Sequence, residues 1–318
     1  MRRRRPVMID LLSELMFDYT LRNVALGAAV LGVVGGALGS FAVLRRQGLY
    51  GDALAHATLP GVCVAFVLSN TRAPAILLAG AAISASLGAL LIIAVVSGTR
   101  IKQDAALGIV LSVFFGFGTV LLTYIAGTGD SGQAGLDRFI FGQAATIVAE
   151  DVLVMGVLGG ASLVVTALLF KEFKIISFDP DFAASAGYPV SRLNLLLTAL
   201  IVAAIVIGIQ TVGVILMAAM LITPAAAARQ WTERLWIMVL VSGFFGAASG
   251  VSGALVSATG PNLPTGPLVV LAATAILLFS LALGRSRGFL WEHLRASRNR
   301  REALRRARGG ASESGGGT

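Results

Sequence analysis

Long apolar runs recur along the whole sequence, each roughly 20 residues long and nearly free of charged side chains. A helix of about 20 residues crosses a hydrocarbon core of roughly 30 Å. Because lipid offers no water to the backbone, each run must pair its own amides and carbonyls, which makes it helical. The pattern predicts an all-α, polytopic helical membrane protein with about eight to nine transmembrane helices.

The predicted spans lie between charged connections. They cover residues 22–44, 53–69, 74–97, 105–126, 149–170, 235–257 and 266–283, and an uncharged stretch runs from 193 to 228. That stretch exceeds one crossing of about 20 residues, so we expect it to break into two segments near Gly208, Gly213 or Pro224. Glycine pairs with the spacing of close helix contacts occur at Gly32–Gly36, Gly35–Gly39, Gly156–Gly160 and Gly246–Gly250.

Composition excludes a soluble domain. Hydrophobic residues make up 56% of the chain and charged residues 13%, with a mean hydropathy of +0.85. The formal net charge of +9 comes from two tails, Arg2 to Arg5 and the arginines between Arg285 and Arg308. Basic tails beside membrane spans typically mark the cytoplasmic side, which argues against a nucleic-acid partner and for contact with membrane lipid.

The expected organisation has three parts. An N-terminal basic and amphipathic segment covers 1–21, a transmembrane domain covers 22–284, and a basic cytoplasmic tail covers 285–318, with its Gly- and Ser-rich end disordered. Lysines and arginines fall on alternate connections if residues 193–228 cross twice, which gives nine spans with the tail inside. Arg2 to Arg5 would then lie outside, against the positive-inside rule. The conflict disappears if Met8 is the true start; if it is not, the number of spans could instead be eight or ten.

Asp52 and His56 are the candidate chemical groups. They lie four residues apart in an apolar segment, so a helix places both on one face, and ionisable groups within a membrane are commonly functional. Carboxylate oxygen and imidazole nitrogen together suit a divalent cation such as Mn²⁺, Zn²⁺ or Fe²⁺. The alternative is an aspartate that caps a helix and a histidine that bonds a neighbouring helix. Cys63 lies near the same face, and we interpret it as a small buried residue.

Several stretches, in order along the chain, resemble the ABC-3 family of metal-ion importer permeases. They are Gly39 to Arg46 with Gly51 to Gly61, Phe178 to Gly187, Gln210 to Arg229, and Leu263 to Pro267. The resemblance implies a multi-pass permease of the bacterial cytoplasmic membrane, expected as a homodimer on two cytoplasmic ABC ATPase subunits. An extracellular or periplasmic binding protein would deliver the metal. Asp52 and His56 would line the ion path, and the metal would be cargo and not a permanent cofactor.

A polar segment at about 178–188 has the marks of a short helix. Asp179 can cap, Pro180 is tolerated in a first helical turn, and Gly187 can end the helix. By resemblance this is the cytoplasmic coupling helix that the ATPase grips, with Asp179, Pro180, Asp181, Ala184 and Gly187 as the contact residues.

Other classes of protein fit the sequence less well. None of the lysines, Lys102, Lys171 and Lys174, follows a glycine, so the chain lacks a phosphate-binding loop and is not itself an ATPase. Gly127 to Asp130 matches the Gly-x-Gly-Asp of intramembrane aspartyl proteases, but no Tyr-Asp partner exists. A proton-coupled secondary metal transporter remains the main alternative. A permease for chelated iron or cobalamin would have little use for bare metal donors.

Overall fold

The computed structural model describes residues 19–71, 73–127, 147–259 and 263–284, and across them the chain is helical with no strand. The all-α expectation is confirmed. The helices are α2 (Tyr19–Leu44), α3 (Tyr50–Ser69), α4 (Pro74–Gly98), α5 (Gln103–Gly127), α7 (Ala149–Leu168), α8 (Phe170–Phe178), α9 (Pro180–Ser185), α10 (Val190–Val212), α11 (Val214–Arg229), α12 (Leu235–Ala258) and α13 (Thr265–Leu283). The N-terminal segment up to residue 18 and the tail from 285 lie outside the described residues.

Eight of the described helices are long and apolar enough to cross a membrane, and α11 is apolar but shorter. The predicted break within 193–228 is confirmed: α10 ends at Val212 and α11 begins at Val214. Gly213 between them has a φ of 85° and a ψ of 164°, a conformation that only glycine adopts without strain. Pro224 does not end a helix and lies within α11.

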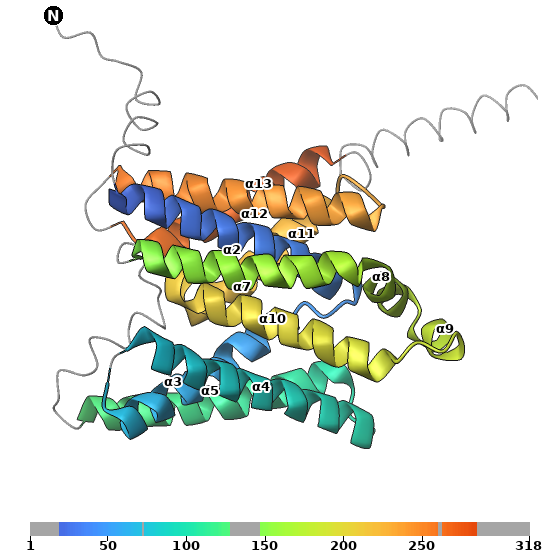
Figure 1. The fold of residues 1–318 in the computed structure, drawn as a ribbon, viewed down its shortest axis with the longest axis horizontal. Coiled ribbons are helices and arrows are strands. Elements are labelled where there is room, and N and C mark those ends of the chain that lie inside the picture. The colour runs from blue at the N-terminus through green and yellow to red at the C-terminus, as the bar shows by residue number, and fades with distance from the viewer. Residues whose placement is uncertain (1–18, 72, 128–146, 260–262, 285–318) are drawn as a thin grey trace, which may run out of the picture.

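The helices run roughly along one direction in two groups (Figure 1). One group contains α2, α7, α11, α12 and α13, and the other contains α3, α4 and α5. Helix α10 packs between them, contacting α2 and α7 on one side and α3 and α4 on the other. Helices α8 and α9 lie together at one end of the bundle, which we call the α9 end.

The core follows α2 and α10. Phe41 on α2, Leu54 on α3 and Ile201 on α10 are almost completely buried, and α2 is the most buried span. Helices α5, α7 and α13 leave most of their side chains at least partly exposed, and many of these are apolar, such as Val120 and Val157. A broad apolar outer surface is what a protein dissolved in lipid presents.

Close glycine contacts join some helices but not all those predicted. A Cβ atom added at Gly32 on α2 would collide with the backbone of Gly246 on α12, and the reverse holds as well. Small residues therefore let these two backbones touch. The prediction for Gly156 and Gly160 is wrong, because a Cβ at either position meets no atom within 4 Å. Those two glycines of α7 lie on its open side.

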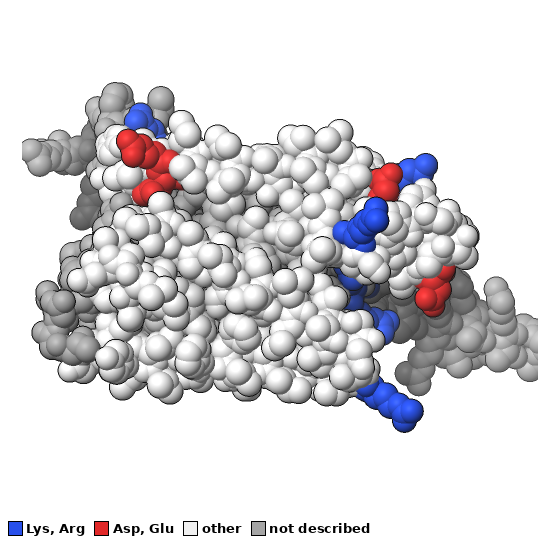
Figure 2. Space-filling view, turned by 60° about the horizontal axis from the view of Figure 1, so that its bottom comes forward, with Lys and Arg blue, Asp and Glu red and all other residues white. Residues whose placement is uncertain are grey.

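Charged side chains gather at the two ends of the bundle and leave a wide uncharged band between them (Figure 2). Most of the basic ones are at the α9 end. They belong to Arg45, Arg46, Arg100, Lys102, Lys171, Lys174, Arg192, Arg229 and Arg234. By the positive-inside rule the α9 end is the cytoplasmic one.

Candidate metal site on helix α3

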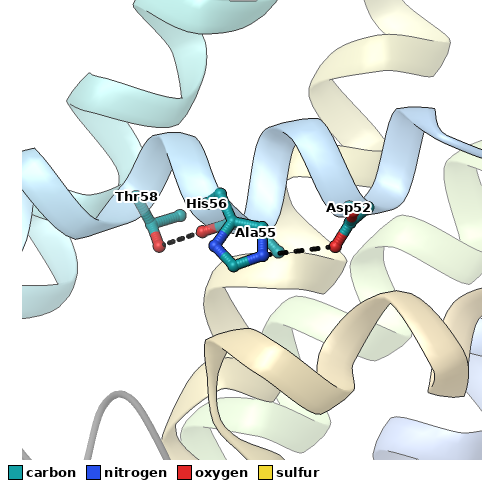
Figure 3. Close-up of polar contacts among 4 residues, drawn as sticks. All are labelled: Asp52, Ala55, His56 and Thr58. Atoms are coloured by element: carbon teal, nitrogen blue, oxygen red, sulfur yellow. Dashed lines mark hydrogen bonds and ion pairs between the residues drawn. The ribbon is translucent and has the colours of Figure 1, made fainter. Parts of the chain in front are cut away.

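Asp52 and His56 lie in the first two turns of α3, with their side chains directed toward each other (Figure 3). The chain enters this helix directly after the basic connection that follows α2. Leu54 and its alanine neighbours on α3 are buried, whereas the side chains of Asp52 and His56 are 34% and 15% exposed. The polar pair thus lies on the one face of this segment that is not packed against the core.

The Nε2 atom of His56 lies 3.4 Å from the Oδ1 atom of Asp52. Two ligands with bonds of about 2.1 Å at a tetrahedral angle are separated by about 3.4 Å. The two donors are therefore spaced as neighbouring ligands of one small divalent ion would be. The same arrangement without metal is a weak ion pair when His56 is protonated.

Helix α5 holds the imidazole in place. The rings of His56 and Phe115 meet edge to face, with centroids 4.9 Å apart and an interplanar angle of 75°. The Nδ1 atom of His56 is buried and has no hydrogen-bond partner among the described residues. The ring is thus oriented by packing and by Asp52, and not by a second hydrogen bond. The sequence did not point to Phe115, because no pattern shows which side chain of α5 faces α3.

The neighbouring polar residues of α3 do not complete a coordination shell. The Thr58 hydroxyl donates to the Ala55 carbonyl at 2.5 Å (Figure 3). The Cys63 thiol is fully buried and directed to the carbonyl of Gly118 at 3.8 Å, as expected for a small core residue. Nowhere in the described ranges do three or more His, Cys, Asp or Glu side chains cluster as a metal site requires. The described part of one chain therefore supplies two of the usual four or more ligands.

The predicted coupling segment forms a separate short helix at the α9 end. The Asp179 side chain accepts a hydrogen bond from the Phe182 amide at 2.9 Å, and Pro180 begins α9. The helix ends at Ser185, and Gly187 follows with a φ of 84°. It is shorter than the predicted 178–188 because Phe178 belongs to the preceding helix, α8. Asp181 and Ala184 are exposed, whereas Ala183 is buried.

Two exposed aromatic side chains, one just before α9 and one within it, were not identified from the sequence. Phe178 is 59% exposed and Phe182 is 60% exposed, at an end of the bundle that also carries the basic residues. Aromatic side chains outside the lipid are typical of protein contacts. In the sequence, the closeness of both aromatic residues to predicted helix boundaries was the feature that could have pointed to them. Asp130 of the protease pattern lies outside the described residues.

Comparison with known proteins places these features in a family. Residues 17–284 match the model of the ABC 3 transport family. The zinc transport system membrane protein TroC of Treponema pallidum is 49% identical over 90% of this chain and 96% of its own length. The manganese transport system membrane protein MntC of Bacillus subtilis is also 49% identical, over 89% of this chain and 65% of its own length.

Solved structures agree with the sequence comparison. The structure of PsaBC from Streptococcus pneumoniae in complex with Fab superposes with a TM-score of 0.77 at 33% identity, covering 89% of this chain and 98% of that one. An inward-facing ABC transporter assigned to the metal-chelate type has a TM-score of 0.65 at 16% identity, with 87% of this chain and 91% of that one covered. The second likeness concerns the fold alone.

Proposed function

Because this chain belongs to the ABC 3 transport family, we propose that it is the membrane-spanning permease of an ATP-driven importer of divalent transition-metal ions. The protein is a multi-pass helical protein of the bacterial cytoplasmic membrane. Two relatives at 49% identity are named for zinc and for manganese, which supports Zn²⁺ or Mn²⁺ as cargo, and the donor pair would also suit Fe²⁺. The observation that carries the proposal is the spacing of Asp52 and His56, 3.4 Å apart on one face of α3.

The pair would act as a transient site. Two ligands hold a divalent ion too weakly for storage, and the remaining positions stay open to water or to a second copy of the chain. In a homodimer with the two pairs facing each other, the site would offer two carboxylates and two imidazoles. Entry of the metal would release a proton from His56 whenever that ring is protonated.

Energy and cargo would come from partners. The chain has no phosphate-binding loop, so cytoplasmic ABC ATPase subunits would hydrolyse ATP and the permease itself would not be an enzyme. Their contact would lie at α9, with Asp179, Pro180, Asp181, Ala184 and Gly187, beside the exposed ring of Phe182. An extracellular or periplasmic binding protein would deliver the metal to the opposite end.

Metal uptake by substituted permeases tests the site. Asp52→Ala and His56→Ala should each lower uptake by at least about tenfold, because each removes one of two charged or polar ligands. Asp104→Ala is the matched control, since Asp104 is also a first-turn aspartate at the α9 end, on α5. All variants must insert and retain the ATPase. Parental uptake in both site variants would overturn the proposal.

The source of energy needs its own experiment. An ATPase subunit that binds but cannot hydrolyse ATP should abolish uptake through the parental permease. Uptake that continues with this subunit and follows the proton gradient would establish the secondary carrier instead.

A further inference from the structure

A cavity of about 460 Å³ opens at the α9 end between the connection after α2, helix α4 and the first turns of α10. Its polar wall includes Arg45, Tyr50, Asn194 and Thr198. Tyr50 precedes Asp52 by two residues, and two helical residues are separated by about 200°, so the cavity and the metal pair lie on opposite faces of α3. The cavity is therefore separate from the site proposed above.

Arg45 brings an unpaired positive charge to this cavity. Its side chain is only partly exposed, and none of the acidic side chains that the structure describes forms an ion pair with it. Burial lowers the pKa of the Arg45 guanidinium from its ordinary value, with nearby Tyr50 acting in the opposite direction. A guanidinium that has lost part of its water and has no anion beside it is a favourable place for a phosphate group.

Asn194 adds an unpaired acceptor. Its Oδ1 atom is buried and lacks a hydrogen-bond partner. The two hydroxyl groups of the adjoining wall already have a hydrogen-bond partner, because those of Tyr50 and Thr198 are 3.2 Å apart and bond to each other. A ligand that complements this wall has both an anionic group for Arg45 and a hydrogen-bond donor for Asn194.

The outer wall of the cavity is apolar. Leu90 and Ile93 of α4 and Leu195 of α10 line it and are 49%, 37% and 46% exposed. These side chains belong to the outer surface of membrane spans, so they face acyl chains and not water. The cavity thus combines a polar floor at the cytoplasmic end with a wall suited to a hydrocarbon chain.

We propose that this cavity binds the headgroup of an anionic phospholipid of the cytoplasmic leaflet, of the phosphatidylglycerol type. One phosphate diester balances the one guanidinium of Arg45, and a glycerol hydroxyl donates to Asn194. Phosphatidylcholine fits less well because its headgroup carries no donor and adds a positive charge next to Arg45. Basic pockets between membrane helices on the cytoplasmic side are a general mode of lipid recognition.

Thermal unfolding of the full chain in detergent tests this proposal. Phosphatidylglycerol should raise the melting temperature, whereas phosphatidylcholine with the same acyl chains and inorganic phosphate should not. Arg45→Met should weaken phosphatidylglycerol binding roughly tenfold, the value of one charge-assisted hydrogen bond. Arg46→Met is the matched control, because Arg46 is the adjacent, exposed arginine that does not line the cavity.

A second variant keeps the proposal testable if Arg45→Met does not fold. Asn194→Leu removes the acceptor and should weaken phosphatidylglycerol binding several-fold while leaving the response to inorganic phosphate unchanged. Equal stabilisation by inorganic phosphate would show a free-anion site and overturn the proposal, as would equal stabilisation by phosphatidylcholine. Normal lipid binding by Arg45→Met, together with loss of the ATPase subunit during purification, would assign Arg45 to a protein contact instead.

Discussion

The rings of Phe115 on α5 and His56 on α3 pack edge to face, with their centroids 4.9 Å apart. This contact fixes the imidazole in the orientation that places Nε2 beside Asp52. Since Nδ1 has no partner, little else restrains rotation of the ring. The proposed metal site would therefore depend on a residue of a neighbouring helix that supplies no ligand.

Substitution of this aromatic ring should change metal affinity without removing a ligand. An aromatic pair contributes about 0.5–1.5 kcal/mol beyond its buried area, so Phe115→Leu should raise the KM of metal uptake by roughly two- to tenfold. The maximal rate should change little. Phe117→Leu is the control, because Phe117 is also an exposed aromatic residue of α5 but makes no described ring contact. Equal effects of the two substitutions would contradict a positioning role.

Acid should weaken metal binding through His56. A proton and a metal ion compete for the same imidazole nitrogen, so the affinity for the metal should fall as the pH is lowered. If metal binding displaces one proton, the Kd for Mn²⁺ or Zn²⁺ should rise by up to about tenfold for each unit by which the pH is lowered. Isothermal titration of the purified chain measures this. His56→Ala should bind metal more weakly, and its Kd should depend much less on pH. If its Kd depends on pH as strongly as that of the parent, the competing proton belongs to another group.

The contact between α2 and α12 should tolerate no added methyl group. Gly32→Ala places a Cβ atom against the backbone of Gly246, and such overpacking typically costs about 1–3 kcal/mol. Thermal unfolding in detergent should show a clear loss of stability. Gly160→Ala on α7 is the control, because its Cβ atom meets open space and alanine favours a helix by about 1 kcal/mol. A loss of the same size in both variants would contradict the idea that the contact between Gly32 and Gly246 causes the loss of stability.

The N-cap of α9 should matter for coupling. Asp179→Ala removes the acceptor for the Phe182 amide and should destabilise the short helix by about 0.5–2 kcal/mol, whereas Asp179→Ser keeps a capping oxygen. Co-purification of the ATPase subunits and metal-stimulated ATP hydrolysis should fall in the first variant and persist in the second. If both variants behave as the parent does, α9 is not the coupling element.

Phe182 gives an independent test of the same surface. Phe182→Asp replaces an exposed ring with a charge and should reduce ATPase co-purification several-fold, since aromatic anchors commonly dominate protein interfaces. Ser185→Asp, on the same helix and also exposed, is the matched control. Retention of the ATPase by Phe182→Asp would place the contact elsewhere.

Local patterns predicted the features of this protein that depend on nearby residues. The break within 193–228 follows from the length of an uncharged stretch, although the sequence left Gly208, Gly213 and Pro224 as candidates, and the Asp52–His56 pair follows from helical spacing. Features that depend on which helices are neighbours were not accessible. Phe115 reaches His56 from another span, and the open side of α7 at Gly156 and Gly160 could not be distinguished from a packed one. Helix α8 was expected only as part of a polar connection, because its nine residues mix charged and apolar side chains.

The place of the metal pair near the start of α3 has an electrical consequence. His56 lies about 9 Å along the helix axis from Tyr50, and about 20 Å of α3 remain beyond it. An ion that moves inward along this helix crosses about two-thirds of the membrane thickness before it reaches the pair. A potential of 100 mV does about 2.3 kcal/mol of work on each elementary charge that crosses the whole membrane. For a divalent cation, movement from the outside to the pair would therefore gain about 3 kcal/mol of the total. The membrane voltage would thus favour loading of the site more than release from it.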